Sequence, residues 1–564
     1  MTALVTKHLP LVAGAPEGIK KLRALILELA VRGRLVPQDS GDEPAAEILF
    51  RISHSRHNAS SPKGATKAFD AANGFDGEPP FDLPNAWAWV RFGGIAQHNS
   101  GKTLDKGRNA GVPRDYITTS NLYWGRFDLS SVRQMLIRDD ELERCTARKN
   151  DLLICEGGEA GRAAVWTDEK EVCFQNHIHR ARMLDGISPH YAYRVFERLN
   201  ASGEISQYRK GVGISNMSSK SLASIPFPLP PIKEQHRIVA KVDELMALCD
   251  RLEADQADAE AAHAQLVQAL LDSLTQATDA ADFRASWQRL SEHFHTLFTT
   301  EASIDALKQA VLQLAVMGKV VPQDPSEGQA CELIDLINAA KAQTSVRVRK
   351  NLETVPLDQV PFELPANWVW ARIGQLALST EYGLSEKTNN SFKGIPVLKM
   401  GDIQGGGVAL DTTARVPEQT EGLPELYLES GDLLYNRTNS AELVGKTGIY
   451  RGPSNAFTFA SYLIRIRFDK RMICPAYVNY VMNSPAFRQT QINPHLKQQC
   501  GQANVNGTIM RNMLVSLPPI AEQHRIVAKV DELMALCDQL KAQLAEARQQ
   551  HAQLATALVE QAVA

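Results

Sequence analysis

Apolar side chains recur every three or four residues along a stretch that occurs twice in the chain. Residues 229–250 read LPPIKEQHRIVAKVDELMALCD and residues 517–538 read LPPIAEQHRIVAKVDELMALCD, so the copies differ only where Lys233 stands against Ala521. Spacing of this kind places the apolar side chains on one face of a helix. The pattern therefore predicts two amphipathic helices that arose by internal duplication.

Each copy is long enough to form one uninterrupted helix. From Glu234 no proline or glycine occurs until beyond residue 275, which permits a helix of about 40 residues. Proline cannot continue a helix, so the steps Pro230-Pro231 and Pro518-Pro519 are the predicted junctions with the preceding segments. Because each helix must carry the chain from one half to the other, we expect an antiparallel pair related by an approximate two-fold axis.

The predicted contact seam follows the alternating four-three spacing of a coiled coil. Its members are Ile238, Val242, Leu245, Cys249, Leu252, Leu266 and Leu270 in the first helix, and Ile526, Val530, Leu533, Cys537, Leu540, Leu544, Leu554 and Leu558 in the second. His263 and His551 occupy matching seam positions. Packing is the favoured interpretation of these histidines, and a metal pair is the alternative.

The duplication extends beyond the long helices. IKKLRALILELAVRGRLVPQD at residues 19–39 aligns with IDALKQAVLQLAVMGKVVPQD at residues 304–324, and PFDLPNAWAWVRFG at residues 80–93 aligns with PFELPANWVWARIG at residues 361–374. The first pair predicts shorter helices at 17–33 and 303–318, which end at Gly33 and Gly318 as C-caps. In the second pair, the alternating tryptophans Trp87 and Trp89, and likewise Trp368 and Trp370, are expected to pack at the base of the segment that follows.

Between the repeated parts lie two stretches with little matching sequence, which we name the first head (residues 80–228) and the second head (residues 361–516). Short apolar runs alternate there with polar, glycine-rich loops, which favours strands. The predicted fold is α+β, with two mixed α/β heads separated by the antiparallel helix pair in a pseudo-two-fold repeat. The remaining predicted segments are an N-terminal helical region 1–79, a central long helix 229–276, a linker with repeated helical region 277–360 and a C-terminal long helix 517–564.

Composition indicates a globular protein. Hydrophobic residues make up 44% of 564 residues and charged residues 22%, with a net charge of -3. The first head carries 20 Lys and Arg against 17 Asp and Glu, and the second carries 15 against 12, so both heads are positive while the rest of the chain is acidic. This distribution is compatible with DNA contact by the heads.

Cysteine spacing and hydropathy bear on the compartment. The eight cysteines form no CxxC pair and no His/Cys cluster at zinc spacing, so we expect reduced thiols. No run of 18 apolar residues occurs, and the first residues lack the apolar centre of a leader peptide. A cytoplasmic protein with no membrane contact is expected.

Motifs for catalysis are incomplete. GKT occurs at Gly101–Thr103 and Gly445–Thr447, but Ala96 and Ser440 stand where a phosphate-binding loop needs its first glycine. We interpret both as loop residues that contact phosphate or bases. No GxGxxG motif, nucleophile elbow, carboxylate-lysine nuclease signature or metal cluster emerges, so no catalytic residue, bound cofactor or metal is expected in this chain.

Polar loop residues of the heads are the candidates for DNA contact. Arg and Lys can bind guanine and Asn and Gln can bind adenine in the major groove. The candidates are Lys102, Thr103, Thr119, Asn121, Arg126, Glu159 and Arg162 in the first head, and Lys387, Asn389, Lys399, Gln404, Asn436, Arg437, Asn439 and Lys446 in the second.

Two variable heads, each followed by a proline-led EQHRIVAKVDELMALCD helix, resemble the DNA specificity subunit of type I restriction-modification enzymes. The resemblance covers almost the whole chain, and the repeated helix is its most specific part, whereas WAWVRFG, GDLL and SNMSSKSLASIPFPLP are looser matches. The helical region repeated at residues 17–52 and 303–337 resembles a subfamily elaboration.

The resemblance implies that each head is a target-recognition domain for one half of a split, asymmetric sequence in double-stranded DNA, with the helices setting the gap. It also implies two modification subunits, which use S-adenosylmethionine to methylate adenine at N6, and two restriction subunits, which need ATP and Mg²⁺. This chain would determine which DNA sequence the complex binds, and it would catalyse no reaction itself.

Three alternatives stay open on the sequence alone. The heads could bind proteins, so that the chain is a non-catalytic scaffold. The near-miss motifs could belong to an enzyme that uses ATP or S-adenosylmethionine. The chain could also be the specificity subunit of a system that only modifies DNA. The DNA sequence recognised, the spacer length and the role of residues 276–302 cannot be inferred.

Overall fold

The computed structural model describes residues 10–58, 75, 77–103, 105, 107, 109–211, 215–343, 355–356, 360–389, 393–496, 498–499 and 502–563. Contacts divide the chain into two compact units, residues 1–259 with 547–564 and residues 260–546. Each unit contains one head and parts of both long helices. The helices α8 (Ile232–Thr275) and α17 (Ile520–Val563) begin directly after the predicted proline junctions and have 44 residues each, which confirms the long-helix prediction.

In the first unit, helices surround a head built from two four-stranded sheets. The helices are α2 (Gly18–Val31), α3 (Ala45–Asn58), α4 (Phe92–Ile95), α5 (Leu142–Cys145), α6 (Pro189–Ala201) and α7 (Ser219–Ala223), with 3₁₀ turns at Asp139–Glu141 and Glu204–Tyr208. One sheet has the order β10 (Ala163–Val165), β8 (Leu152–Cys155), β12 (Ile178–Met183), β2 (Ala96–Ser100). The other has the order β6 (Arg133–Ile137), β3 (Val112–Ile117), β11 (Val172–Phe174), β7 (Thr146–Ala147).

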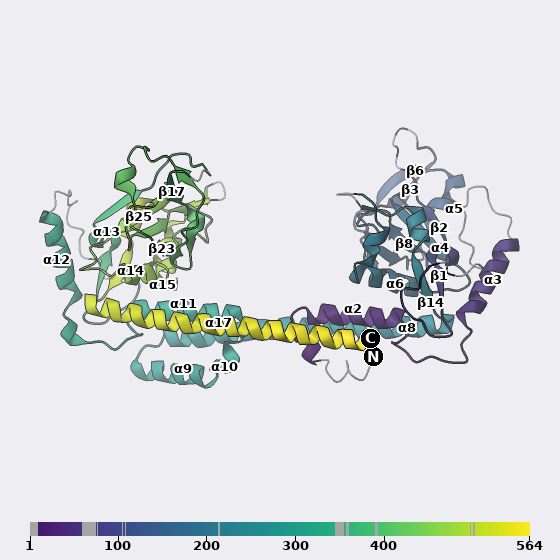
Figure 1. The fold of residues 1–564 in the computed structure, drawn as a ribbon, viewed down its shortest axis with the longest axis horizontal. Coiled ribbons are helices and arrows are strands. Elements are labelled where there is room, and N and C mark those ends of the chain that lie inside the picture. Colours follow the sequence, from purple (N-terminus) through teal and green to yellow (C-terminus); the bar gives the residue numbers. More distant parts are fainter. Residues whose placement is uncertain are drawn as a thin grey trace. The chain divides into compact units, whose positions relative to one another are not determined.

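Three short antiparallel pairs complete the first head. They are β1 (Ala88–Arg91) with β14 (Pro226–Leu229), β4 (Leu122–Tyr123) with β5 (Arg126–Phe127), and β9 (Gly157–Gly158) with β13 (Ser215–Asn216). Figure 1 shows α2 along α8 beneath the strands of this head. Leu22 of α2, Phe92 of the head and Val242 of α8 belong to one buried cluster, so head and helices share a core.

The second unit repeats this plan. Its helices are α9 (Ala280–Glu292), α10 (Phe294–Leu297), α11 (Glu301–Val316), α12 (Ala330–Gln343), α13 (Ile373–Leu376), α14 (Pro475–Met482), α15 (Pro485–Phe487) and α16 (Gly507–Asn512), with a π-helical turn at Arg488–Ile492 and 3₁₀ turns at Pro325–Glu327, Met400–Asp402, Leu423–Leu426 and Asn493–His495. The main sheet has the order β16 (Ser379–Tyr382), β25 (Leu463–Arg467), β21 (Leu433–Asn436), β23 (Thr447–Ile449), β19 (Gly407–Val408), β18 (Ile403–Gln404).

Smaller sheets again flank the main one. They are β20 (Arg415–Val416), β17 (Ile395–Leu398), β24 (Thr458–Phe459); β22 (Thr438–Asn439), β27 (Gln502–Asn504), β26 (Gln498–Gln499); and β15 (Val369–Arg372) with β28 (Leu514–Leu517). The core of this unit joins Val311 of α11, Tyr435 of the head and Val530 of α17. The α+β repeat is therefore confirmed.

The repeated Glu-Gln pair fixes each head to its long helix. In the first unit the Trp87 indole donates to Glu234 Oε2 at 3.0 Å and Gln38 Nε2 donates to Oε1 at 2.6 Å. The second unit repeats both bonds at Glu522, with Trp368 at 3.0 Å and Gln323 at 2.7 Å. We call each set the head socket. Both tryptophans are buried, which confirms their predicted place at the base of the heads.

The glutamine beside each socket carboxylate holds the start of the long helix. Gln235 Nε2 donates to Pro230 O at 2.9 Å and its Oε1 accepts the backbone N–H of Ser188 at 2.8 Å. Gln523 makes the same bonds with Pro518 O and with the N–H of Cys474. The near-identity of the two helix copies thus preserves one set of contacts with two different heads.

Contacts of α2 fix the relative direction of the long helices in the first unit. Gln256 donates to Ala13 O and Gln38 reaches Glu234, so α2 runs opposite to α8. His551 bonds Leu11 O and Arg34 donates to Val563 O, so α2 runs with α17. Hence α8 and α17 are antiparallel there, as predicted. His551 lies in a packing contact rather than a metal site.

The second unit has the same relation through α11. Lys308 pairs with Asp538 and Gln323 with Glu522, so α11 runs opposite to α17. His263 bonds Thr296 O and Lys319 donates to Thr275 O, so the chain around α11 runs with α8. The Lys308–Asp538 pair mirrors the Arg23–Asp250 pair of α2, since Asp250 and Asp538 occupy equal positions of the duplicated helix.

The buried positions of the long helices follow the predicted seam near the heads and depart from it farther along. Ile238, Val242, Leu245, Cys249, Ile526, Val530 and Cys537 are buried, and Leu252, Leu270, Leu533, Leu540, Leu544 and Leu558 are half-buried. Leu266 is 53% exposed and Leu554 is 48% exposed, whereas the next residues, Val267 and Ala555, are buried. A helix of 3.6 residues per turn drifts about 20° per heptad from a strict 3.5 repeat, so after four heptads the buried stripe has moved by one residue.

The long helices are also not each other's sole partners. Ile238 and Val242 belong to the core of the first unit, and Ile526 and Val530 to that of the second, each together with residues of its head. The stretch after α8 supplies further packing, because Leu290, Leu297 and Phe298 of the α9–α10 region share a cluster with Leu271. Among the described residues no helix combines the length and apolar character needed to cross a membrane.

Candidate nucleic-acid interface

Both heads contain one buried structural ion pair that anchors an equivalent strand. Asp151 precedes β8 and forms two bonds of 2.8 Å with Arg182 of β12. Asp432 precedes β21 and forms two bonds of 2.7 Å with Arg467 of β25. Both aspartates are buried, so the Asp-Leu-Leu motif noted in the sequence serves the fold of each head rather than its surface.

The residue that follows this strand has the same backbone contacts in both heads. The N–H of Glu156 donates to His177 O at 2.8 Å, and its carbonyl accepts from Met217 at 2.7 Å. In the second head the N–H of Arg437 donates to Tyr462 O at 3.1 Å, and its carbonyl accepts from Val505 at 2.9 Å. The two heads therefore have the same backbone hydrogen bonds at this position, and we call this shared backbone the frame. The side chains that it carries differ chemically between the heads.

An aromatic hairpin collects three of the predicted residues in the first head. Arg126 of β5 stacks on the Tyr123 ring at 4.5 Å, and Arg162 lies 5.4 Å from the same ring. The Trp124 indole donates to Glu159 at 2.7 Å, and Arg162 donates to Glu159 at 3.2 Å. These exposed or half-exposed groups form a patch of mixed donors and acceptors suited to base edges and phosphates.

The other first-head candidates have more structural roles. The Thr119 carbonyl accepts from Arg162 at 2.6 Å, which joins Thr119 to the patch through its backbone. Lys102 is half-buried and paired with Glu141, and this contact lowers the pKa of the Glu141 carboxyl. Thr103 is exposed beside it. Nothing in the structure places Lys102 and Thr103 with the aromatic hairpin.

The prediction of Asn121 as a DNA contact is wrong. Asn121 is buried, its Oδ1 accepts the Thr118 N–H at 2.9 Å, and its Nδ2 donates to the carbonyls of Asp128 and Ser131 at 3.0 Å. All its hydrogen-bonding capacity serves the turn before β4. Asparagine in this role is common in turns, and sequence alone does not separate it from a binding asparagine.

One loop carries four of the predicted residues of the second head. Arg437 stacks on the Tyr382 ring at 4.9 Å, and its Nε is buried without a hydrogen bond in the described part of the chain. Asn439 is half-buried and its Oδ1 accepts the Ser440 N–H at 2.8 Å. Lys446 is exposed at the position that corresponds to Arg162 of the first head, because Asn436 N–H bonds its carbonyl as Cys155 bonds that of Arg162.

Asn436 is the second wrong assignment. It is buried at the end of β21, and its Nδ2 donates to Leu443 O at 3.3 Å. The second GKT also begins a strand, because Thr447 is buried on β23 and donates to Gly445 O. The side chains of Asn436 and Thr447 therefore stabilise the loop by donating to its backbone carbonyls.

The remaining second-head candidates lie on other segments. Lys387 is exposed, and the backbone of Asn389 pairs with Arg415 before β17. Lys399 is exposed and caps the short helix at Met400–Asp402 through its backbone. Gln404 lies on β18, at the edge of the main sheet opposite to β16. No contact brings these four residues into the Arg437 loop.

Sequence reasoning missed the aromatic residues and one pair of equivalent positions. Tyr123, Tyr382 and Tyr462 are exposed beside the predicted arginines. Glu156 lies opposite Arg437 in the alignment that equates Asp151 with Asp432, so extending that alignment by five residues would have identified it.

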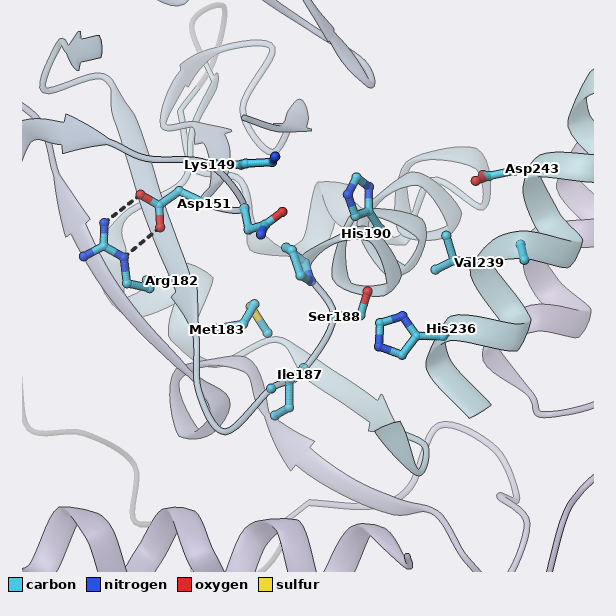
Figure 2. A pocket seen from close by; sticks show the side chains of 14 residues that line it. Lys149, Asp151, Arg182, Met183, Ile187, Ser188, His190, His236, Val239 and Asp243 are labelled. Carbon is cyan, nitrogen blue, oxygen red and sulfur yellow. Dashed lines mark hydrogen bonds and ion pairs between the residues drawn. The ribbon is translucent and has the colours of Figure 1, made fainter. Parts of the chain in front are cut away.

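A cavity of 570 Å³ lies at the junction of the first head with α8. Figure 2 shows His190 on the head side facing His236 and Asp243 of α8, with the Asp151–Arg182 pair at the opposite end. Burial lowers the pKa of His190, so this ring is neutral at neutral pH. The cavity wall therefore combines ion-paired side chains, the neutral His190 ring and apolar residues such as Ile187 and Val239.

Metal and thiol chemistry receive no support within the described residues. No group of three or more His, Cys, Asp or Glu side chains there is arranged to hold a metal ion. The seven cysteines described are free. Burial raises the pKa of the Cys155 thiol to about 11, so this thiol is protonated at neutral pH.

Comparison with known proteins agrees with this architecture. The family model described as the type I restriction modification DNA specificity domain matches residues 84–261 and 365–547. Each match spans one head and the start of the following long helix. The chain therefore belongs to the family of type I restriction-modification DNA specificity subunits.

Two individual relatives are similar over nearly their full length. The specificity subunit of the type I restriction enzyme EcoAI from Escherichia coli is 33% identical over 97% of this chain and 94% of its own. That of EcoEI, also from Escherichia coli, is 32% identical with the same coverage. A solved structure described as the basis of complex assembly and conformational transition of the type I R-M system has a TM-score of 0.50, covers 86% of this chain and 99% of its own, and is 16% identical, which bears on the fold alone.

Proposed function

We propose that this chain is the DNA-reading subunit of a type I restriction-modification complex, in which each head recognises one half of a bipartite, asymmetric target. The observation that carries the proposal is the shared frame of the two heads, on which Glu156 and Arg162 in one head occupy the positions of Arg437 and Lys446 in the other. Two heads that share a backbone frame but carry different surface side chains are suited to binding two different DNA sequences in the same way.

The charge of the heads supports duplex DNA as the ligand. Each head has an excess of basic residues, although the chain as a whole is acidic. Phosphate contacts by Arg and Lys provide affinity, and a few bidentate contacts to base edges provide specificity of about 1 to 3 kcal/mol each. Two linked heads also gain affinity through effective concentration.

The exposed face of the repeated helix supports two copies of one partner. Glu244 and Ala247 are exposed, and so are the identical Glu532 and Ala535 at the equivalent positions of α17. Packing within this chain does not require the exposed residues of α8 and α17 to be identical. We propose that two modification subunits bind these equal faces and methylate adenine at N6 with S-adenosylmethionine. Two restriction subunits, which use ATP and Mg²⁺, complete the complex, and this chain itself has no catalytic role.

The test is single-molecule sequencing of DNA from cells that express the chain with its neighbouring modification subunit. We expect N6-methyladenine in a split motif with one methylated adenine in each half. The modification subunit expressed alone is the control and should leave the DNA unmodified. If both proteins are soluble and associated but no motif is methylated, the proposal fails and the scaffold alternative gains support.

A further inference from the structure

Glu156 and Arg437 occupy the same backbone position of the two heads and have opposite charge. Each follows the last residue of the central strand, β8 or β21, and each is held by the same two backbone hydrogen bonds. A short antiparallel pair begins at the next residue in both heads, β9 with β13 or β22 with β27. The position is therefore defined by the frame, and only the side chain differs.

The Glu156 carboxylate is available as a hydrogen-bond acceptor. Within the described residues its one ion-pair contact is with His179, whose Nε2 lies 3.8 Å from Oε2 and bonds Met217 O at 2.9 Å. Burial lowers the pKa of His179, so the ring is neutral at neutral pH and leaves the carboxylate charge uncompensated. Gly157 and Gly158 follow, and no atom of the described residues lies within 4 Å of a Cβ built at Gly158, so the loop after the acceptor is open in that direction.

The Arg437 guanidinium is available as a donor. It is half-buried against Tyr382, at 4.9 Å from the ring centroid, and no hydrogen bond or ion pair of its side chain occurs among the described residues. Stacking holds the planar group in one orientation without using its N–H groups. A fixed guanidinium with free donors has the geometry required for a bidentate contact.

We propose that Glu156 and Arg437 are equivalent specificity-determining residues, and that they select complementary base edges. Glu156 accepts from the amino group of cytosine or adenine in the half-site of the first head. Arg437 donates to O6 and N7 of guanine in the half-site of the second head. This inference rests on the proposed function, since it assigns a base class to each head at one defined position.

The test uses the complete complex with its modification subunit and compares methylated motifs for wild type, Glu156→Gln and Arg437→Lys. Glutamine retains the shape of Glu156 but can also donate, so one position of the first half-site should lose its preference for an amino-bearing base by about ten-fold. Lysine retains the charge of Arg437 but lacks the planar fork, so one guanine of the second half-site should lose a similar preference. The other half-site should stay unchanged in each case.

Matched controls are Glu169→Gln in the first head and Arg471→Lys in the second, which alter exposed side chains paired only with Lys149 and Asp469. Both should leave the motif unchanged. Urea unfolding of each variant, together with duplex binding at several salt concentrations, separates loss of folding and loss of phosphate contact from loss of base selection.

Two outcomes would overturn the inference while leaving the proposed function intact. One is a split motif in wild type that is identical in both variants. The other is a uniform loss of binding to all sequences with a smaller salt dependence, which marks a phosphate contact. If wild type itself produced no split motif, the proposed function and this inference would both fail.

Discussion

One buried carboxylate in each unit links a head to its long helix. Glu234 and Glu522 each accept from an indole and an amide, and water is no ready substitute for the carboxylate at the indole because the tryptophans are buried, whereas the amide donors Gln38 and Gln323 are exposed. Replacing either glutamate with alanine should lower the free energy of unfolding by about 1–3 kcal/mol for each donor left unpaired. Urea unfolding monitored by tryptophan fluorescence measures the change. The exposed Glu244→Ala is the control, and an equal effect there would refute the socket's role.

The same carboxylates predict a pH dependence of stability. Burial raises the pKa of Glu234 and of Glu522 above the ordinary value of 4.5, so the folded state favours the protonated form. Their contribution to stability is therefore largest below pH 4.5 and decreases as pH rises from 4.5 through the raised folded values. Relative to a Glu234→Gln/Glu522→Gln double variant, wild type should lose stability over this interval in urea titrations. Parallel pH curves for the two proteins would contradict the prediction.

At the scale of single residues, the sequence identified loops better than side-chain roles. Arg126, Glu159 and Arg162 were named as separate loop candidates, and their contact in one patch was not predicted because it depends on the packing of β5 against the loop after β9. Asn121 and Asn436 were assigned wrongly, since an asparagine that satisfies backbone groups has the same local sequence context as one that faces solvent. Only the three-dimensional positions of the Thr118 N–H and the Leu443 carbonyl decide between the two roles.

At the scale of elements, the drift of the buried stripe makes a direct prediction. Leu271 is buried in the α8 cluster, while the predicted seam residue Leu266 is exposed. Leu271→Ala should lower the free energy of unfolding by about 2–5 kcal/mol, and Leu266→Ala should change it by about 0.5 kcal/mol or less. Chemical denaturation of the two variants checks this. A larger loss of stability for Leu266→Ala than for Leu271→Ala would instead support a strict heptad seam.

The C-caps of α2 and α11 provide a second element-scale test. Gly33 and Gly318 have φ of +67° and +72°, and a Cβ there would lie 2.5 Å and 2.6 Å from the ring carbons of Pro84 and Pro365. Alanine at either site should therefore cost more than the roughly 1–2 kcal/mol of the left-handed conformation alone. Gly203 is the control, because its φ is +78° and its Cβ direction is open. Thermal unfolding of the three alanine variants should rank Gly203→Ala as the mildest.

At the scale of the whole molecule, the duplicated helices predict a dependence of the recognised spacer on helix length. Insertion of one heptad within residues 254–262 of α8 and another within residues 542–550 of α17 preserves the apolar stripe. Each heptad adds about 10 Å of helix, which corresponds to about three base pairs. Methylation motifs of the variant complex should show a longer spacer with both half-sites unchanged. A heptad added after Val563 is the control, and an unchanged spacer in the internal variant would refute the relation.

The whole-molecule plan was accessible from the sequence because duplication reveals architecture directly. The two proline-led helices, their antiparallel direction and the α+β heads all followed from the repeat and its connectivity. The division of each long helix between two units was not accessible, because it depends on packing with α2, α9 and α11 that the heptad pattern does not encode. The heads were predicted least well, since their strands are short and their pairing is non-local.

The near-identity of the head sockets also affects how such a chain can change by descent. A crossover within the coding stretch for the repeated EQHRIVAKVDELMALCD segment retains an intact socket on either side, whichever head is carried across. The reading frame and the anchoring carboxylate survive the exchange together. Heads are thereby interchangeable units of inheritance, and a lineage can acquire a new recognition surface in one genetic event instead of accumulating substitutions in its loops.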